Sequence, residues 1–282
     1  MANFTLSAFA DEINPALDIQ MRVIKDCGIH HIEVRGIDGK NISTYTPDEA
    51  KQIKRQLDQN GVKISSVGSP IGKIKITSPM DDHLAVFRNV IEIAKILDTQ
   101  YIRLFSFYIP EGEDPANYRD EVLKRMQMFV DTAKGSGLTL LHENEKGIYG
   151  DTDKRCLDIL ESIGSETLKA VFDPANFVQC GVSTYPEAFE LLLPYIEYMH
   201  IKDAGEDGVV VPAGHGIGKV PEILGALKEK GFDGFLSLEP HLAHFVGLSK
   251  LEAGREREKV SQDTEEKFRM AVDALKQILN RL

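Results

Sequence analysis

The chain has 282 residues, of which 42% are hydrophobic and 27% charged, a composition typical of a globular protein with an ample core. Its formal net charge of −11 argues against nucleic acid as a partner, since binding to phosphate backbones needs an excess of Lys and Arg. Three scattered cysteines indicate neither a disulfide framework nor a thiolate zinc site, and the lack of a basic leader or a long apolar run predicts a cytoplasmic protein without a membrane partner.

A short phrase recurs along the chain: an amphipathic helix, a glycine near its end, and a short apolar strand closed by a polar residue. Four clear copies contain Gly28, Gly61, Gly137 and Gly231, where a glycine relieves the strain that ends a helix. Four weaker copies fill the gaps, which gives eight strands. In chain order the expected strands lie within residues 6–12, 27–35, 60–67, 99–106, 137–143, 168–174, 196–203 and 230–239.

Helical stretches separate the expected strands. Several begin with a capping residue followed by proline, such as Thr46-Pro47 and Asp114-Pro115. No linker divides the chain, and no Gly-rich dinucleotide-binding turn follows the first strand. The pattern therefore predicts an α/β fold, a closed (β/α)8 TIM barrel, as a single domain over residues 1–282.

The segment 247–262 is polar, highly charged, and follows the eighth expected strand. A loop at this position of a barrel lies over the catalytic face, so the segment could act as a lid. A solvated helical extension with Glu and Arg pairs four residues apart explains the same composition equally well.

Polar residues stand at the carboxyl ends of the last four expected strands, where the active site of a barrel forms. Strand alternation points Glu143, Asp173, His200 and Glu239 in the same direction. Three carboxylates and an imidazole gathered there would repel one another unless a cation compensates their charge. The sequence therefore predicts a divalent metal ion. Oxygen-rich ligation with one histidine favours Mn²⁺ or Mg²⁺, with Co²⁺, Fe²⁺ or Zn²⁺ as alternatives.

These residues lie in phrases that resemble the xylose-isomerase-like TIM barrels, a superfamily of sugar isomerases and epimerases that shares its fold with apurinic endonucleases. The matching phrases are LLHEN around Glu143, FDPAN around Asp173, MHIKD around His200, PAGHGIG before a helix, and LSLEPH around Glu239. The endonuclease branch carries additional histidines that assemble three metals, whereas Asn176 stands here in the place of one of them. The resemblance thus implies one metal ion and argues against DNA repair.

The resemblance also implies a reaction. Glu143 and Glu239 would serve both as metal ligands and as the pair that moves a proton at a substrate carbon, through a metal-stabilised enediolate. We therefore expect a metal-dependent isomerase or epimerase of a small sugar, polyol ketone or sugar phosphate. Two alternatives stay open: a dehydratase of the inosose or dehydroshikimate type, and a barrel that binds a sugar without catalysis. Barrels of this group are often dimers or tetramers, which leaves a homo-oligomer open as well.

Other polar residues near the expected strand ends are candidates for substrate binding, with a salt bridge in the barrel mouth as the alternative for the charged ones. Asp203 is expected to brace the ligand shell. His142 alternates away from Glu143, which favours a packing or surface role. The substrate-binding candidates are Glu33, Arg103, Glu145, Asn176, Lys202, His215 and His241.

Overall fold

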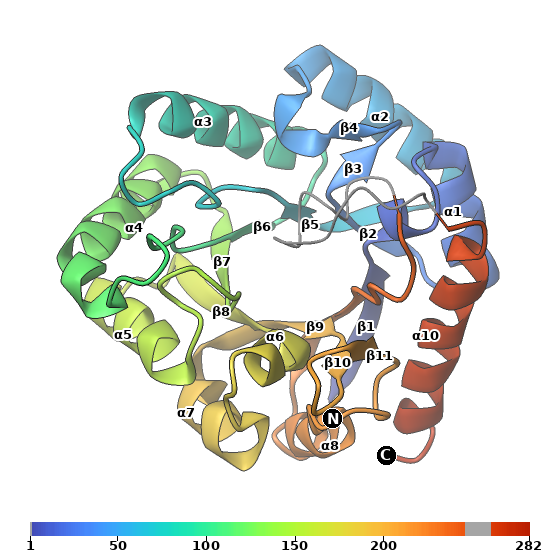
Figure 1. The fold of residues 1–282 in the computed structure, drawn as a ribbon. Helices are drawn as coiled ribbons and strands as arrows, with labels where there is room; N and C mark the ends of the chain where they lie inside the picture. Colours follow the sequence, from blue (N-terminus) through green and yellow to red (C-terminus); the bar gives the residue numbers. More distant parts are fainter. Residues whose placement is uncertain (1, 246–260) are drawn as a thin grey trace.

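Eight parallel strands close into a barrel, and the helices form a ring around it (Figure 1). The strand order is β1-β12-β9-β8-β7-β6-β5-β2, so the first and last barrel strands pair with each other. This closed barrel is the fold that the sequence predicts. The barrel strands are β1 (Asn3–Ala8), β2 (His31–Val34), β5 (Lys63–Gly68), β6 (Tyr101–Leu104), β7 (Thr139–Glu143), β8 (Leu168–Phe172), β9 (Ile196–Ile201) and β12 (Asp233–Leu238).

This computed structural model describes residues 2–245 and 261–282, so the segment considered as a lid lies outside the described residues except for its last two positions. None of the described helices is long and apolar enough to span a membrane. The helices are α1 (Leu17–Asp26), α2 (Pro47–Asn60), α3 (Asp81–Ile96), α4 (Arg119–Ala133), α5 (Asp153–Ile163), α6 (Pro174–Gln179), α7 (Phe189–Leu192), α8 (Val220–Glu229) and α10 (Thr264–Leu279).

Short elements decorate the loops of the barrel. Two small antiparallel hairpins, β3 with β4 and β10 with β11, leave the ends of β2 and β9. Their strands are β3 (Gly36–Ile37), β4 (Lys40–Asn41), β10 (Asp203–Ala204) and β11 (Val210–Val211). Single helical turns are η1 (Ala10–Glu12), η2 (Ile42–Thr44), η3 (Pro115–Tyr118), η4 (Thr184–Ala188) and η5 (Leu193–Tyr195).

The capping residues that the sequence predicts at the ends of helices are clearest at α2. Thr46 accepts a hydrogen bond from the backbone N–H of Glu49, and the Glu49 side chain bonds back to the N–H of Thr46. Gly61 ends the same helix in the left-handed region, with φ of 66°. Asp114 instead caps the short turn η3, which leads into α4.

The first strand differs from its prediction. It begins at Asn3 rather than at Leu6, and Ala10–Glu12 form a 3-10 turn in place of its expected end. Every residue of β1 lies opposite a residue of β12, from Asn3 beside Asp233 onwards. Because this pairing joins the two ends of the chain, no local pattern in the sequence indicates where the strand starts.

The barrel interior is packed in layers beneath the carboxyl ends of the strands. Leu141, Val171 and Tyr198 form an apolar cluster, as alternation along their strands predicts. Next to it, the hydroxyl of Ser65 is shared between Ser7, at 2.6 Å, and Tyr198, at 2.8 Å. These contacts fill the interior of the barrel beneath its polar mouth.

Candidate metal centre

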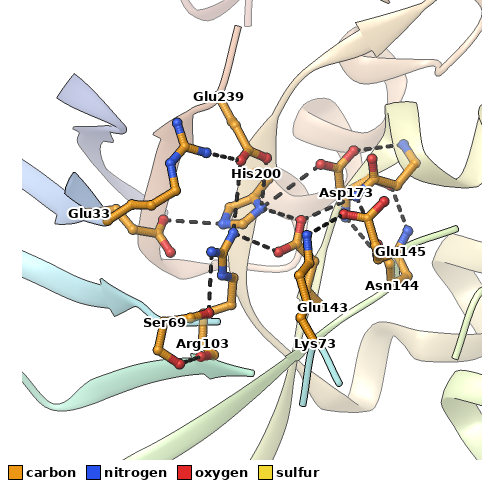
Figure 2. A network of polar contacts seen from close by, with 12 residues as sticks. Glu33, Ser69, Lys73, Arg103, Glu143, Asn144, Glu145, Asp173, His200 and Glu239 are labelled. Carbon is orange, nitrogen blue, oxygen red and sulfur yellow. Dashed lines mark hydrogen bonds and ion pairs between the residues drawn. The ribbon is translucent and has the colours of Figure 1, made fainter. Parts of the chain in front are cut away.

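The four predicted ligands come together at the mouth of the barrel (Figure 2). Glu143 ends β7, Asp173 follows β8, His200 lies in β9, and Glu239 follows β12. Each offers one ligand atom, and these atoms all lie within 4.8 Å of one another. The four side chains are at most 4% exposed, so little water is left to screen their charges.

Each ligand carboxylate has one oxygen turned inward, toward Nδ1 of His200. The distances from Nδ1 are 3.1 Å to Glu143 Oε1, 3.6 Å to Glu239 Oε2 and 3.9 Å to Asp173 Oδ2. An imidazole nitrogen and three carboxylate oxygens that face one point are donors suited to a divalent ion. The residues of this chain therefore fit the metal that the sequence predicts.

The outer carboxylate oxygens are held by the protein. Arg103 donates to Glu143 Oε2 over 2.9 Å, and Arg35 donates to Glu239 Oε1 over 2.8 Å. The outer oxygen of Asp173, Oδ1, accepts the backbone N–H of Asn176 over 2.9 Å, because Asp173 caps α6. These contacts fix each carboxylate so that its inner oxygen faces His200.

Glu33 holds the far side of the histidine. Its Oε2 lies 3.2 Å from Nε2 of His200, on the ring nitrogen that points away from the other carboxylates (Figure 2). A carboxylate in this place selects the tautomer and the ring orientation of a metal-binding histidine. The ring of Phe9 packs edge-on against His200, with the ring centres 5.2 Å apart.

Lys202 lies on the inner side of the same cluster. Its Nζ is 3.0 Å from Asp173 Oδ2 and 3.1 Å from Glu239 Oε2. Burial would lower the pKa of Lys202, but these two carboxylates raise it well above its ordinary value. The side chain is therefore an ammonium ion at neutral pH.

The carboxylates differ in their proton affinity. Burial would raise the pKa of Glu143, but the neighbouring His200 and Arg103 outweigh it and hold that pKa at about 2. At Glu239 the opposing effect of Lys202 and His241 likewise brings the pKa well below its usual range. Burial wins at Asp173, where the pKa rises to about 6 despite Lys202. In the absence of a metal ion, Glu143 and Glu239 are ionised at neutral pH.

Two amides connect the ends of β7 and β8. Asn144 donates to the backbone carbonyl of Asp173 and accepts its N–H, both over 2.9 Å, so its side chain prolongs the pairing of the two strands. Asn176 donates to Glu143 Oε1 over 3.2 Å and to the carbonyl of Asn144 over 2.9 Å. These bonds tie the positions of Glu143 and Asp173 to each other.

A second network lies beside Glu239, and its carboxylates Asp11 and Glu12 were not among the predicted site residues. Arg35 forms two bonds with Asp11, of 2.9 and 3.0 Å, and one with Glu12 over 3.3 Å. His241 Nε2 lies 3.4 Å from both Glu12 and Glu239. Asp11 and Glu12 follow β1 in the turn η1, where strand alternation gives no information about direction.

The remaining substrate-binding candidates divide into two groups. Glu145, Asn176, Lys202 and His241 line one small cavity above the cluster, with a free volume of roughly 10 Å³, and Lys73 pairs with Glu145 over 3.0 Å. His215 is exposed and lines a separate groove along α10, so the structure does not bring it to the metal centre.

Asp203 binds the backbone of a loop, whereas it was expected to brace the ligand shell. Its carboxylate accepts backbone N–H groups of Ala204, Gly214, Gly216 and Gly218, at 2.8 to 3.0 Å. A Cβ atom on Gly216 would lie 2.4 Å from Asp203 Oδ1 and 2.2 Å from the carbonyl oxygen of Ala204. The phrase PAGHGIG is thus a loop wrapped around the Asp203 carboxylate, and this residue braces the loop rather than the ligands.

His142 lies on the other face of β7, as predicted, and is buried. Burial lowers its pKa to about 4, so the ring is neutral at physiological pH. A Cβ atom on Gly150 would lie 2.4 Å from the His142 ring, which shows how closely the backbone packs there. His142 therefore has a packing role.

Comparisons with known proteins agree with this architecture. The family described as xylose isomerase-like TIM barrel matches residues 21–280. The uncharacterized protein MJ1311 of Methanocaldococcus jannaschii is 30% identical over 161 residues, which are 54% of this chain and 54% of that protein. The chain thus spans about half the length of the curated relative it matches.

Solved structures with the same fold cover nearly the whole chain. The IOLI protein with a bound zinc atom has a TM-score of 0.76 at 16% identity, over 98% of both chains. L-ribulose 3-epimerase has a TM-score of 0.74 at 18% identity, over 100% of this chain and 95% of that one. The probable 3-DHS dehydratase AsbF of Bacillus anthracis has a TM-score of 0.74 at 16% identity, over 98% and 99%. Identities this low show the fold alone, but the family match covers most of the chain, and the protein belongs to the xylose isomerase-like TIM barrels.

Proposed function

We propose that this protein is a metal-dependent isomerase or epimerase that moves a proton at a carbon atom of a small sugar, a polyol ketone or a sugar phosphate. The observation that carries the proposal is the shared orientation of the three ligand carboxylates, whose inner oxygens face Nδ1 of His200. Side chains gathered for a structural salt bridge alone need no such common point.

The donor set suits Mn²⁺ or Mg²⁺, and the zinc atom in the IOLI structure supports a divalent ion in barrels of this kind. When bound, such an ion would polarise a substrate carbonyl and stabilise negative charge on its oxygen. Glu143, Asp173, His200 and Glu239 would hold it. Glu33 would keep His200 in the orientation that binding requires.

Glu143 and Glu239 are the residues that would carry the proton. Both are ionised at neutral pH, so either can accept a proton from a substrate carbon. Arg103 lies between them, 2.9 Å from Glu143 and 3.8 Å from Glu239, and stabilises both in the charged form. One carboxylate would remove the proton and one would return it, a contribution of about 10²- to 10⁴-fold to the rate.

The small cavity beside the cluster does not hold a sugar in this conformation, but the residues that line it favour a substrate rich in hydroxyl groups. Its walls are almost entirely polar and include the carboxylate of Glu145 and the amides of Asn176 and Gln179. Such groups accept and donate hydrogen bonds to hydroxyls in defined positions. The structural similarity to L-ribulose 3-epimerase supports a sugar or polyol in this place.

A dehydratase is the second candidate. It is favoured by the buried ammonium of Lys202 beside the ligand carboxylates and by the similarity to the probable 3-DHS dehydratase AsbF. A carboxylate would remove a proton from the carbon next to a carbonyl, and the hydroxyl on the adjacent carbon would leave as water with a proton from Lys202. The product would then be lighter than the substrate by one water molecule.

A screen of ketoses, aldoses, inososes and their phosphates tests the proposal. The protein is stripped with a chelator, reloaded with Mn²⁺ or Mg²⁺, and followed by NMR in D₂O. An isomerase or epimerase would introduce deuterium at a carbon atom and yield an isomer of the substrate. A dehydratase would yield a product that has lost one water molecule. Ligand binding that stabilises the protein equally well in a chelator, with no deuterium exchange, would instead identify a sugar-binding barrel without catalysis.

A further inference from the structure

Lys202 pairs with carboxylate oxygens that would bind the metal ion. Its Nζ contacts the inner oxygens Asp173 Oδ2 and Glu239 Oε2, two of the three that face Nδ1 of His200. The lysine side chain is 4% exposed, so its charge must be balanced by groups of the protein. It forms ion pairs with these two carboxylates.

The arginines of the site behave differently. Arg103 donates to the outer oxygen of Glu143, and Arg35 donates to the outer oxygen of Glu239. Both contacts are compatible with a metal ion on the inner side, and both support the ligands in the required orientation. Among the lysines and arginines of the described residues, Lys202 is the one that pairs with inner oxygens.

An ammonium ion and a divalent ion on the same two oxygens repel each other. Charges a few ångströms apart in a buried site change binding constants by more than about tenfold, because little solvent screens them. One of the two cations must therefore yield. Lys202 also lines a small cavity together with Glu145, whose carboxylate would attract the displaced ammonium group.

We propose that Lys202 is a tethered cation: it neutralises the inner oxygens of Asp173 and Glu239 in the unloaded protein, and the incoming metal ion displaces it toward Glu145. The proposal rests on the metal centre of the proposed function. It makes metal loading an exchange of one cation for another, and it places a positive group beside the substrate only in the loaded protein.

Metal affinity in the absence of substrate tests the exchange. Lys202→Gln removes the competing charge, so calorimetric titration of the chelator-stripped protein with Mn²⁺ should give a Kd about tenfold or more below that of the wild type. Lys73→Gln is the matched control, because Lys73 is also largely buried near the cluster but pairs with Glu145. Its Kd should change by less than about threefold. Lys202→Arg, which keeps the charge, should bind Mn²⁺ no more tightly than the wild type.

Thermal unfolding gives a second reading that does not depend on activity. Without metal, Lys202→Gln should melt below the wild type, because the inner carboxylates lose their counter-ion. With saturating Mn²⁺ the difference should disappear or reverse. If the variant does not fold without metal, recovery of a cooperative melt on addition of Mn²⁺ carries the same information.

The outcomes separate this inference from the proposed function. An unchanged or weaker affinity in Lys202→Gln, or an equal gain in Lys73→Gln, overturns the exchange while the metal centre stands. If neither the wild type nor the variants bind a divalent ion, the metal centre fails and the proposed function fails with it. Tight Mn²⁺ binding in Lys202→Gln alone supports the exchange even when no substrate is found.

Discussion

Glu33 Oε2 lies 3.2 Å from Nε2 of His200, and this contact turns the opposite ring nitrogen toward the three carboxylates. Glu33→Leu should therefore lower the affinity for a divalent ion about 10- to 100-fold, as losses of such supporting carboxylates do. Glu33→Gln, which keeps an acceptor oxygen, should lose less. Calorimetric titration with Mn²⁺ measures both, and equal affinities in all three proteins would show that the contact does not orient the ring for metal.

Glu143→Gln and Glu239→Gln keep the shape of each side chain and remove its ability to accept a proton. We expect each to lower turnover at least about 10²-fold on the substrate that the screen identifies. Circular dichroism should confirm an intact barrel, and metal content should be measured at the concentrations of the assay. A fully active Glu239→Gln protein would falsify the role of this carboxylate in proton transfer.

Gly72 has no room for a side chain. Its φ is 88°, and a Cβ atom would lie 1.9 Å from the carbonyl oxygen of Phe105. Gly112 has a similar φ of 79° with nothing within 4 Å of such an atom, which makes it a matched control. Both alanine variants should lose about 1–2 kcal/mol to left-handed strain. Gly72→Ala should lose a further 1–3 kcal/mol or so from overpacking, as measured by urea unfolding. Similar losses in the two variants would contradict the close contact.

His83 links stability to pH. Its Nε2 accepts the backbone N–H of Gly72 over 2.8 Å, and burial, with Arg125, lowers its pKa from the ordinary 6.5. The unfolded chain therefore takes up a proton at higher pH than the folded one. The stabilisation is complete above pH 6.5 or so and is lost as the pH falls through the lower, folded-state pKa. His83→Gln keeps an acceptor without titrating.

Chemical unfolding of wild type and His83→Gln between pH 8 and 5 checks this expectation, the pH limits being roughly those at which a histidine changes charge. The free energy of unfolding of the wild type should fall relative to that of the variant as the solution becomes acidic. His30→Gln replaces an exposed histidine and serves as a control. Parallel pH profiles for wild type and His83→Gln would contradict the prediction.

The fold was predictable because its signals are local. Each predicted strand or helix is indicated by a pattern within about ten residues: alternation, a capping residue or a glycine such as Gly61. The same local order placed Glu143, Asp173, His200 and Glu239 at strand ends that point one way, and the structure brings them together. Local order failed at β1, whose start is set by pairing with β12.

Contacts across the barrel were beyond the sequence pattern. Glu33 was a candidate for substrate binding, and its contact with His200, 167 positions further along the chain, was not anticipated. Asp203 was expected to brace the ligands. Its carboxylate instead accepts the backbone N–H groups of Gly214 and Gly216, which lie 11 and 13 positions further along the chain. Such partners depend on distances between strands, and period and capping signals carry no information about them.

The two halves of the chain contribute different parts of the centre. The four ligands belong to residues 143–239, whereas the guanidinium groups that hold their outer oxygens, Arg35 and Arg103, come from β2's end and β6. A chain whose early strands have not yet docked therefore has the carboxylates but lacks the arginines that restrain them. In the proposed metal centre, tight binding of an ion would therefore depend on contacts between the two halves of the barrel.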